Sequence, residues 1–326
     1  MDVVSLFCGI GGLDKGFIDA GYHVIWANDF DRYAVQTYQA NYNHPVILAD
    51  INEYPLEDIP AHDILIGGFP CQPFSMMGEQ RGFDDARGTL FFRIAEIIQY
   101  QIEHNRKPRA IILENVRALR THDGGNTLAV IRRIMEKELG YKVFDMVLNS
   151  ADYGVPQTRN RLYLVCFANE DVTEFDPPAE TRNDFILRDV LEHDVDDKYY
   201  LSDRIRPTIL ANGTGGYVAR SEINQDIARP LCATMAKMHR ACQDNYVSDR
   251  YIYQDETLDE NRIRRLTPRE CARLQGFDEY NTSDFNIPVS DSQAYKQFGN
   301  AVTVNVSRAV AWQVRNKLEK IGEWID

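Results

Sequence analysis

The sequence predicts an α/β fold: a Rossmann-like sheet, mixed but mostly parallel, with a second, smaller and irregular domain. Short β-branched runs recur between turn or polar residues, a pattern typical of buried strands. Helical patterns lie between several of them, and the clearest places Leu128, Ile131, Ile134 and Met135 on one face before it stops at Gly140. Alternating strands and helices favour a parallel sheet with helices on both faces. The expected strands are residues 3–7, 23–27, 46–48, 63–66, 110–113, 142–148 and 161–167.

The composition suits a globular protein of about two domains, with 326 residues of which 44% are apolar and 26% charged. No apolar run reaches the roughly 18 residues of a membrane span, and a strand pattern begins without a basic leader, so we expect a soluble, cytoplasmic protein. The six cysteines have no paired spacing and are expected to be reduced. A net charge of −13 argues against a protein that coats nucleic acid nonspecifically.

The alternation of strands and helices stops after Phe167 and gives way to short, irregular segments with Pro-rich and Gly-rich stretches. This change predicts a domain boundary. We expect a catalytic and cofactor-binding domain formed by residues 1–169 and 296–326, and a smaller domain over residues 170–295. An amphipathic helix over about residues 304–321 should return the chain to the first domain.

A glycine-rich turn follows the first expected strand. Residues 7–12 read FCGIGG, and glycines at such a strand-to-helix turn let the backbone approach a ligand closely. Asp29 ends the second expected strand, 20 residues after Gly9, where a carboxylate can accept hydrogen bonds from ribose hydroxyls. The turn therefore predicts a nucleoside pocket, although Asp14 stands where a dinucleotide fingerprint has its third glycine, and a plain tight turn is the alternative. Asp50 lies at the same sheet edge, and taken singly it is more typical of a helix cap.

A cysteine stands at the end of the fourth expected strand. Residues 67–75 read GGFPCQPFS, so two glycines and two prolines stiffen the turn around Cys71. Most cysteines of reduced proteins are inert core residues. This thiol is instead expected at the carboxyl edge of the sheet beside the glycine turn, and a thiolate is a strong nucleophile even when only a small fraction is ionised. Cys71 is therefore a candidate covalent nucleophile.

Three further groups are expected at the same edge. Glu114 directly follows the fifth expected strand in the sequence LENV, and taken alone it could form an ion pair or a cap. Residues 157–161 read QTRNR and enter the seventh strand, so Arg159 and Arg161 are expected on one face of it. Two guanidinium groups there could hold a phosphate or a base carbonyl, and two surface arginines are the alternative.

Five segments in this order carry a resemblance to a known family: FxGxGG, PCQ, ENV, QxRxR, and QFGNAV at residues 297–302. Together they closely resemble the DNA (cytosine-5) methyltransferase family, especially its small bacterial modification enzymes. The resemblance covers the chain apart from a variable segment near residues 170–260. It implies the fold of S-adenosylmethionine-dependent methyltransferases, with S-adenosyl-L-methionine as cofactor and S-adenosyl-L-homocysteine as its product.

The resemblance also assigns cofactor positions. Asp29 would meet the ribose, although relatives often carry Glu there, and Asp50 would accept from the adenine amino group. Phe30 and Ile51 would sandwich the adenine. The full set that the resemblance implies is Phe7, Gly9, Gly11, Gly12, Asp29, Phe30, Asp50, Ile51, Pro70, Leu90, Asn300 and Val302.

The family chemistry implies roles for the candidate catalytic residues. Cys71 would attack C6 of cytosine and make C5 reactive, while a protonated Glu114 would donate to N3. Arg161 would bind O2 and orient Glu114, and Arg159 would anchor the Cys71 segment or a nearby phosphate. A cytosine inside duplex DNA is unreachable, so it would be flipped out at a cost of a few kcal/mol, and residues 75–88 would close over it.

Contacts with DNA are expected in the segment that begins at the Cys71 turn and continues through residues 75–88, and in the second domain. Residues 229–235 read RPLCATM and resemble the target-recognition signature of the family, and the cations that follow are candidate base readers or phosphate contacts. Residues 262–270 resemble the segment that organises this domain and are expected to be structural. The residues expected to contact DNA are Gln72, Ser75, Arg87, Thr234, Lys237 and Arg240.

Other interpretations explain fewer residues. A zinc deaminase would need a His-x-Glu motif, which is absent, and a second cysteine where Phe74 stands, and no metal is expected. An NAD dehydrogenase would leave Cys71 and the arginine pair without a role. Two alternatives stay open: the same chemistry on a tRNA cytosine, and a noncatalytic DNA-binding relative. We expect a monomer in the bacterial cytoplasm, associated with the nucleoid and not with a membrane. Its expected partner is double-stranded DNA, and a cognate restriction endonuclease could act separately.

Overall fold

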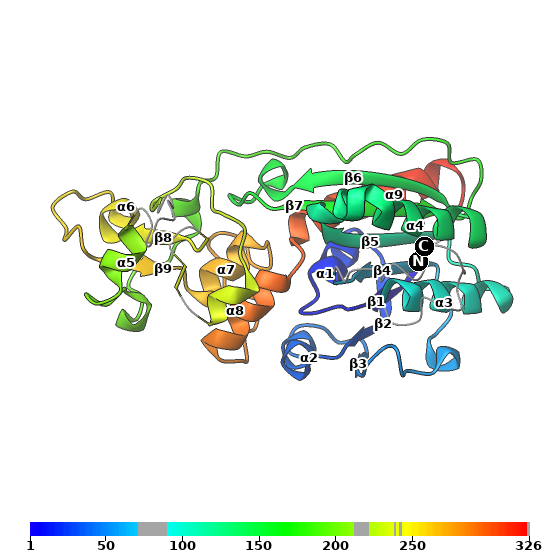
Figure 1. The fold of residues 1–326 in the computed structure, drawn as a ribbon, viewed down its shortest axis with the longest axis horizontal. Coiled ribbons are helices and arrows are strands. Elements are labelled where there is room, and N and C mark those ends of the chain that lie inside the picture. Colours follow the sequence, from blue (N-terminus) through cyan, green and yellow to red (C-terminus); the bar gives the residue numbers. More distant parts are fainter. Residues whose placement is uncertain (71–89, 212–221, 238, 241–242, 325–326) are drawn as a thin grey trace. The chain divides into compact units, whose positions relative to one another are not determined.

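Seven strands form one sheet (Figure 1), in a computed structural model that describes residues 1–70, 90–211, 222–237, 239–240 and 243–324. The strands are β1 (Asp2–Leu6), β2 (His23–Asp29), β3 (Val46–Leu48), β4 (Ile64–Gly68), β5 (Ala110–Val116), β6 (Lys142–Asn149) and β7 (Asn160–Phe167). Their order is β3, β2, β1, β4, β5, β7, β6. Neighbours from β3 to β5 are parallel, whereas β7 runs antiparallel to β5. The expected mixed, mostly parallel sheet is confirmed.

Helices cover both faces of this sheet. They are α1 (Gly12–Asp19), α2 (Arg32–Gln39), α3 (Leu90–Glu103), α4 (Asn126–Arg133) and α9 (Val304–Lys320). Val4 of β1 points into the apolar cluster that α3 and α4 build, and the next side chain, Ser5, points to the other face and meets Asp14 of α1. On that face α9 packs on α1, where Ser307 donates to the carbonyl of Leu13 at 2.8 Å. Among the described residues, no helix combines the length and apolarity needed to cross a membrane.

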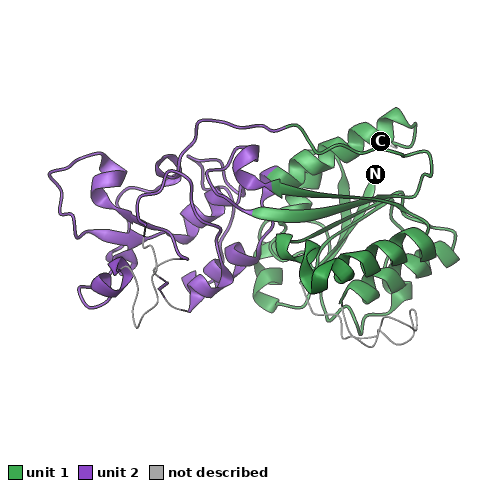
Figure 2. Cartoon of the chain, turned by 45° about the horizontal axis from the view of Figure 1, so that its top comes forward, with its two compact units in different colours: residues 1–148, 160–179, 306–326 green, residues 149–159, 180–305 purple. Residues whose placement is uncertain are grey.

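The chain divides into two compact units, which Figure 2 shows in green and purple. Unit 1 holds the large sheet and comprises residues 1–148, 160–179 and 306–326, and unit 2 comprises residues 149–159 and 180–305. Among its described residues, unit 2 contains a two-stranded antiparallel sheet and short α-helices. These are β8 (Tyr246–Ser248), β9 (Ile263–Arg265), α5 (Arg206–Leu210), α6 (Asp249–Tyr253), α7 (Pro268–Leu274) and α8 (Asp291–Asn300).

The bounds of the units differ from the ranges expected from the sequence, and particular contacts explain the difference. Residues 149–159 belong to unit 2, in which Gln157 forms a parallel bridge with Ala228. The segment after β7 stays with unit 1, in which the ring of Phe175 contacts Phe167 at a centroid distance of 5.2 Å. The first contact joins residues 71 positions apart and the second lies within an irregular segment, so neither leaves a periodic signal in the sequence.

Unit 2 is organised around a buried ion pair. The side chains of Arg264 and Glu270 are both 0% exposed, and Nη2 lies 2.6 Å from Oε1. The same carboxylate accepts the N–H of Thr267, whose hydroxyl accepts the N–H of Glu270, and the two bonds form a capping box at the start of α7. The segment over residues 262–270 is thus structural, in agreement with the sequence analysis.

Candidate active site

The glycine turn joins β1 to α1 in a backbone conformation that requires glycine. Gly9 and Gly11 have φ angles of 56° and 84°, in the left-handed region. A Cβ on Gly11 would lie 2.4 Å from Cε2 of the Tyr42 ring, whereas a Cβ on Gly9 would meet nothing within 4 Å. The turn is therefore packed from behind at Gly11, and it faces open space at Gly9.

Asp29 ends β2 and is fixed against the glycine turn. Its Oδ2 accepts the N–H of Gly9, and its Oδ1 accepts the N–H of Asp31, each at 2.8 Å. Burial raises the pKa of Asp29 above its usual range, an effect that these N–H donors oppose. A carboxylate oxygen has more than one acceptor position, so Asp29 can still receive hydroxyl donors from a ligand.

The residues expected around an adenine differ in the surface they offer. Phe30 is 74% exposed, which leaves its ring available for stacking. Ile51 is 2% exposed and belongs to the main apolar cluster, so it offers little surface to a base. Asp50 is exposed, and its Oδ1 accepts from the backbone and side-chain N–H groups of Asn52 at 2.9 and 3.0 Å, which forms a local turn. The sandwich of the adenine stays a prediction.

Glu114 and Arg161 lie side by side on neighbouring antiparallel strands. Glu114 lies within β5 rather than directly after it, because the strand continues to Val116. In the register of β5 and β7, Val116 faces Arg161, and Nε of Arg161 lies 3.1 Å from Oε1 of Glu114. Only 21% of the arginine side chain and 10% of the glutamate side chain are exposed, so water weakens this pair less than a surface pair. Arg161 thereby orients the Glu114 carboxyl group.

The chain that leaves β4 is fastened beside Glu114. Gly68 pairs with Glu114 in the sheet, and the side-chain amide of Asn115 donates to the carbonyl of Phe69 at 2.8 Å. Pro70 follows and is exposed, and Leu90 begins α3 half-buried. The other expected residues of this segment, Cys71, Gln72, Ser75 and Arg87, lie outside the described residues.

Arg159 does not share a strand face with Arg161, which corrects the expectation from the sequence. It precedes β7, belongs to unit 2 and is 3% exposed. Its Nη1 donates to the carbonyl of Leu231 at 2.8 Å, and its Nη2 donates to those of Gly299 and Ala301 at 3.0 and 2.8 Å. Backbone carbonyls thus accept hydrogen bonds from the guanidinium N–H groups of Arg159 that were expected to hold a phosphate. A role of Arg159 at the Cys71 segment stays a prediction.

The QFGNAV turn, residues 297–302, is built by unit 2. Asn300 ends α8 and is exposed, and Val302 is half-buried. A Cβ on Gly299 would lie 2.1 Å from the backbone nitrogen of Ala233, so the close packing of α8 on this neighbouring segment requires glycine. The part of Asn300 and Val302 in cofactor binding stays a prediction.

The candidate base readers also lie in unit 2, near the 3₁₀ turn Ala233–Ala236. Thr234 is half-buried within this turn. Arg240 donates through Nη1 to Oε1 of Gln243 at 2.6 Å. Lys237 is exposed, and in the part of the chain that the structure describes its ammonium group forms no ion pair or hydrogen bond, so it is the more available of the two cations.

Sequence reasoning missed three residues that hold these motifs in place. Asp14 is buried under the glycine turn, Asn115 fastens Phe69, and Gln157 donates to the carbonyl of Leu274 at 2.9 Å. Each is a polar residue inside a motif whose chemistry does not require it. A polar residue among apolar neighbours in the sequence could have indicated such a role, because a buried polar side chain needs hydrogen-bond partners.

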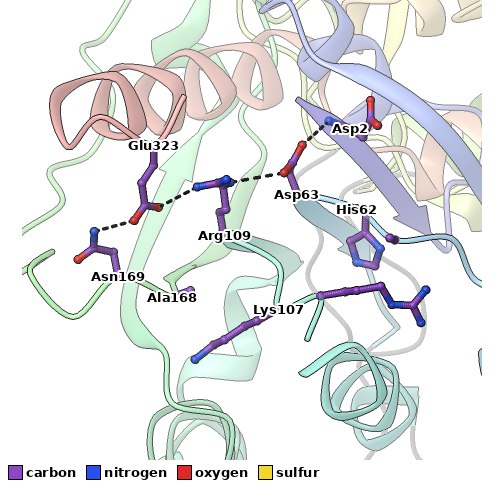
Figure 3. Close-up of a pocket in the computed structure, with 10 residues that line it drawn as sticks. Asp2, His62, Asp63, Lys107, Arg109, Ala168, Asn169 and Glu323 are labelled. Atoms are coloured by element: carbon purple, nitrogen blue, oxygen red, sulfur yellow. Dashed lines mark hydrogen bonds and ion pairs between the residues drawn. The ribbon is translucent and has the colours of Figure 1, made fainter. Parts of the chain in front are cut away.

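A cavity of about 600 Å³ lies at the opposite, amino-terminal edge of the sheet in unit 1 (Figure 3). Arg109 lies between Asp63 and Glu323, at 3.4 and 4.0 Å, and Asn169 donates to Glu323 at 2.7 Å. These contacts tie the end of the chain to the sheet and are remote from the glycine turn. No group of His, Cys, Asp and Glu suited to a metal ion occurs among the described residues.

Known proteins resemble this chain over nearly its whole length. The family model for C-5 cytosine-specific DNA methylase matches residues 1–316. The chain is 42% identical to the type II methyltransferase M.NlaX of Neisseria lactamica, over 98% of each chain. It is 34% identical to the type II methyltransferase M.HhaI of Haemophilus parahaemolyticus, over 97% of this chain and 94% of that one.

Solved structures share the fold. The Entamoeba histolytica methyltransferase EhMeth has a TM-score of 0.75 at 17% identity, over 98% of each chain. A DNMT2 mutant from Spodoptera frugiperda has a TM-score of 0.71 at 20% identity, over 96% of this chain and 99% of that one. With the family match over nearly the full length, the chain belongs to the C-5 cytosine-specific DNA methylase family and is a DNA (cytosine-5-)-methyltransferase.

Proposed function

We propose that this enzyme transfers a methyl group from S-adenosyl-L-methionine to C5 of a specific cytosine in double-stranded DNA. The observation that carries the proposal is the juxtaposition, at the carboxyl edge of one sheet, of the glycine turn with Asp29 and the Glu114–Arg161 pair. The strands that bear them are β2, β1, β5 and β7, and only β4 lies between β1 and β5 in the order of that sheet. Open α/β sheets bind ligands at this edge.

The residues around the glycine turn fit this cofactor. The open space at Gly9 admits close approach of a ligand, the Asp29 carboxylate suits ribose hydroxyls, and the exposed Phe30 ring suits a base. The first N–H groups of α1, from Gly12 onward, suit a carboxylate. When bound, the cofactor supplies an electrophilic methyl group and leaves as S-adenosyl-L-homocysteine.

The residues of the chain prepare the cytosine for methylation. The Cys71 thiolate forms a bond to C6, and the electron pair of the C5–C6 double bond moves into the ring. A protonated Glu114 donates to N3 and offsets this charge, a contribution of about 10²–10⁴-fold for a positioned acid. Arg161 holds Glu114 in place and binds O2. After C5 has accepted the methyl group, a base removes the C5 proton, the double bond re-forms and the Cys71 thiolate leaves.

Recognition of DNA falls to unit 2 in this proposal. The target cytosine is flipped out of the duplex, and of the two candidate cations Lys237 is more exposed than Arg240 and better able to read a base or meet a phosphate. Relatives at 34–42% identity over nearly the whole chain are bacterial type II methyltransferases. This supports a modification enzyme in a bacterial cytoplasm. The proposal includes action as a monomer on DNA, with a cognate restriction endonuclease acting separately.

The two alternatives make different predictions. A tRNA cytosine-5 methyltransferase would transfer the methyl group to tRNA, and a noncatalytic DNA-binding relative would transfer none. The type II relatives favour DNA, and the presence of Cys71, Glu114 and Arg161 in the sequence favours catalysis.

Transfer of a tritiated methyl group to duplex DNA and to tRNA tests the proposal. We expect the wild type to label DNA alone, and bisulfite sequencing of the product to report the target site. Cys71→Ala should keep its affinity for DNA and for S-adenosyl-L-homocysteine and lose transfer, and Glu114→Gln should lose about 10²–10⁴-fold in rate. Appreciable turnover by Cys71→Ala would exclude the covalent step, and labelling of tRNA alone would establish the first alternative.

A further inference from the structure

Asp14 is a fully buried carboxylate under the glycine turn. It lies in the first turn of α1 and is 0% exposed. Oγ of Ser5 donates to its Oδ2 at 3.0 Å, and Oη of Tyr38 donates to its Oδ1 at 2.5 Å. These donors come from β1 and α2, so three elements of unit 1 converge on one acidic group.

The neighbours of Asp14 also hold the glycine turn. Oη of Tyr42 donates to the carbonyl of Gly11 at 3.0 Å, and its ring packs on that of Tyr38 with centroids 4.5 Å apart. Cys8, inside the turn, packs against Tyr38 in a small buried cluster. The position of the Asp14 carboxyl group is thereby coupled to the position of the turn.

In the part of the chain that the structure describes, no cation forms an ion pair with the carboxylates of this part of the site, Asp14 and Asp29. Burial raises the pKa of Asp14 to about 6, against the hydrogen bonds from Tyr38 and Ser5, which lower it. After burial, the charges of Asp14 and Asp29 are the next causes that raise the pKa of Cys8, so both carboxylates act on the turn. An unpaired buried charge is costly, and a cation bound at the turn would offset that cost.

We propose that Asp14 is a specificity-determining residue of the cofactor site, whose charge favours the sulfonium of S-adenosyl-L-methionine over the neutral thioether of S-adenosyl-L-homocysteine. The inference rests on the proposed function, because it takes the glycine turn as the cofactor site. The two ligands differ at the sulfur by one methyl group and one positive charge. A buried anion near the turn therefore discriminates between them and helps the product to leave.

The discrimination requires the ionised form of Asp14. Above about pH 6 the carboxylate is charged and favours the sulfonium, and below that pH the group is neutral and the preference is lost. Several titratable groups face this network. Cys8 and Asp29 lie at the turn, Tyr38 lies in α2, and Tyr42 and His44 follow α2, with Nε2 of His44 2.5 Å from Oη of Tyr38. The charges of Asp19 and Asp31 act on Tyr42 and on Asp29.

Calorimetric titration of the full chain with each ligand between about pH 5 and pH 8 tests the inference. For the wild type, the ratio of the Kd of S-adenosyl-L-homocysteine to that of S-adenosyl-L-methionine should fall about tenfold from the high to the low end. In Asp14→Asn the ratio should be low and independent of pH. Tyr38→Phe keeps the charge but removes a donor that favours it, so the midpoint should move to higher pH.

The outcomes separate the inference from the proposed function. Equal weakening of both ligands in Asp14→Asn at every pH would make Asp14 merely structural and refute the inference. A pH-dependent ratio that persists in Asp14→Asn would assign the effect to another group, such as His44, and refute it as well. If Asp14→Asn does not fold, an unmoved midpoint in Tyr38→Phe is the refuting result. If the wild type binds neither ligand, the proposed function falls and the inference with it.

Discussion

The two glycines of the turn that have positive φ should respond differently to the same substitution by alanine. Gly9 and Gly11 both have positive φ, and a left-handed conformation costs alanine about 1–2 kcal/mol. At Gly9 the new methyl group meets nothing within 4 Å, so Gly9→Ala should lose only this amount. At Gly11 it would lie 2.4 Å from the Tyr42 ring, whose hydroxyl is bonded to the carbonyl of Gly11. Overpacking adds about 1–3 kcal/mol, so Gly11→Ala should lose about 2–5 kcal/mol in all.

Gly9→Ala should weaken ligand binding more than it weakens stability, because its methyl group enters the space that we assign to the cofactor. Urea unfolding with and without S-adenosyl-L-homocysteine measures both quantities in one experiment. A ligand at 100 times its Kd stabilises a protein by about 2.7 kcal/mol. The wild type should show this gain, and Gly9→Ala should lose most of it while it remains well folded.

Either of two results would refute this reasoning. A gain from ligand in Gly9→Ala as large as in the wild type would show that the open side of the turn does not hold the cofactor. Equal stability of Gly9→Ala and Gly11→Ala would show that the Tyr42 ring moves aside without cost.

Two further predictions concern buried charge. Arg264→Met should destabilise the protein by about 3–5 kcal/mol in urea unfolding, because Glu270 is left buried without its partner. The control Arg182→Met, at an exposed ion pair, should cost less than about 1 kcal/mol. Equal losses in the two variants would contradict this account. Burial lowers the pKa of His62 to about 4, so between about pH 6.5 and pH 4 the unfolded chain binds a proton that the folded chain does not. The wild type should therefore lose up to about 3 kcal/mol relative to His62→Asn over that range, and parallel stability curves would show that folded His62 takes up the proton.

Much of the fold could be predicted because its signals are local. Short runs of β-branched and apolar residues predicted the first five strands, and the structure has a strand, β1 to β5, at each of these runs. The glycine turn was also a local prediction, since positive φ at Gly9 and Gly11 is a property of the backbone of those residues. Asp29 followed from its place at the end of β2, which brings it to the turn at 2.8 Å.

Other predictions failed or were absent because they depend on which segments become neighbours. Arg159 and Arg161 are two positions apart, yet one fastens carbonyls of unit 2 and the other orients Glu114. Nothing in their spacing distinguishes them. In the sequence Asp14 was only a departure from a glycine pattern. The folded structure shows that Tyr38 and Ser5 donate hydrogen bonds to its buried carboxyl group.

The sequence by itself determined the class of fold and the order of strands and helices along the chain, and it supplied the groups that we propose to react, because each depends on residue type and short-range spacing. Tertiary structure alone decided that β7 lies antiparallel beside β5, which places Arg161 against Glu114, and that residues 149–159 join unit 2. The physical reason is that hydrogen bonds and ion pairs act over a few ångströms in space, whatever the distance along the chain, so only the folded arrangement selects the partners.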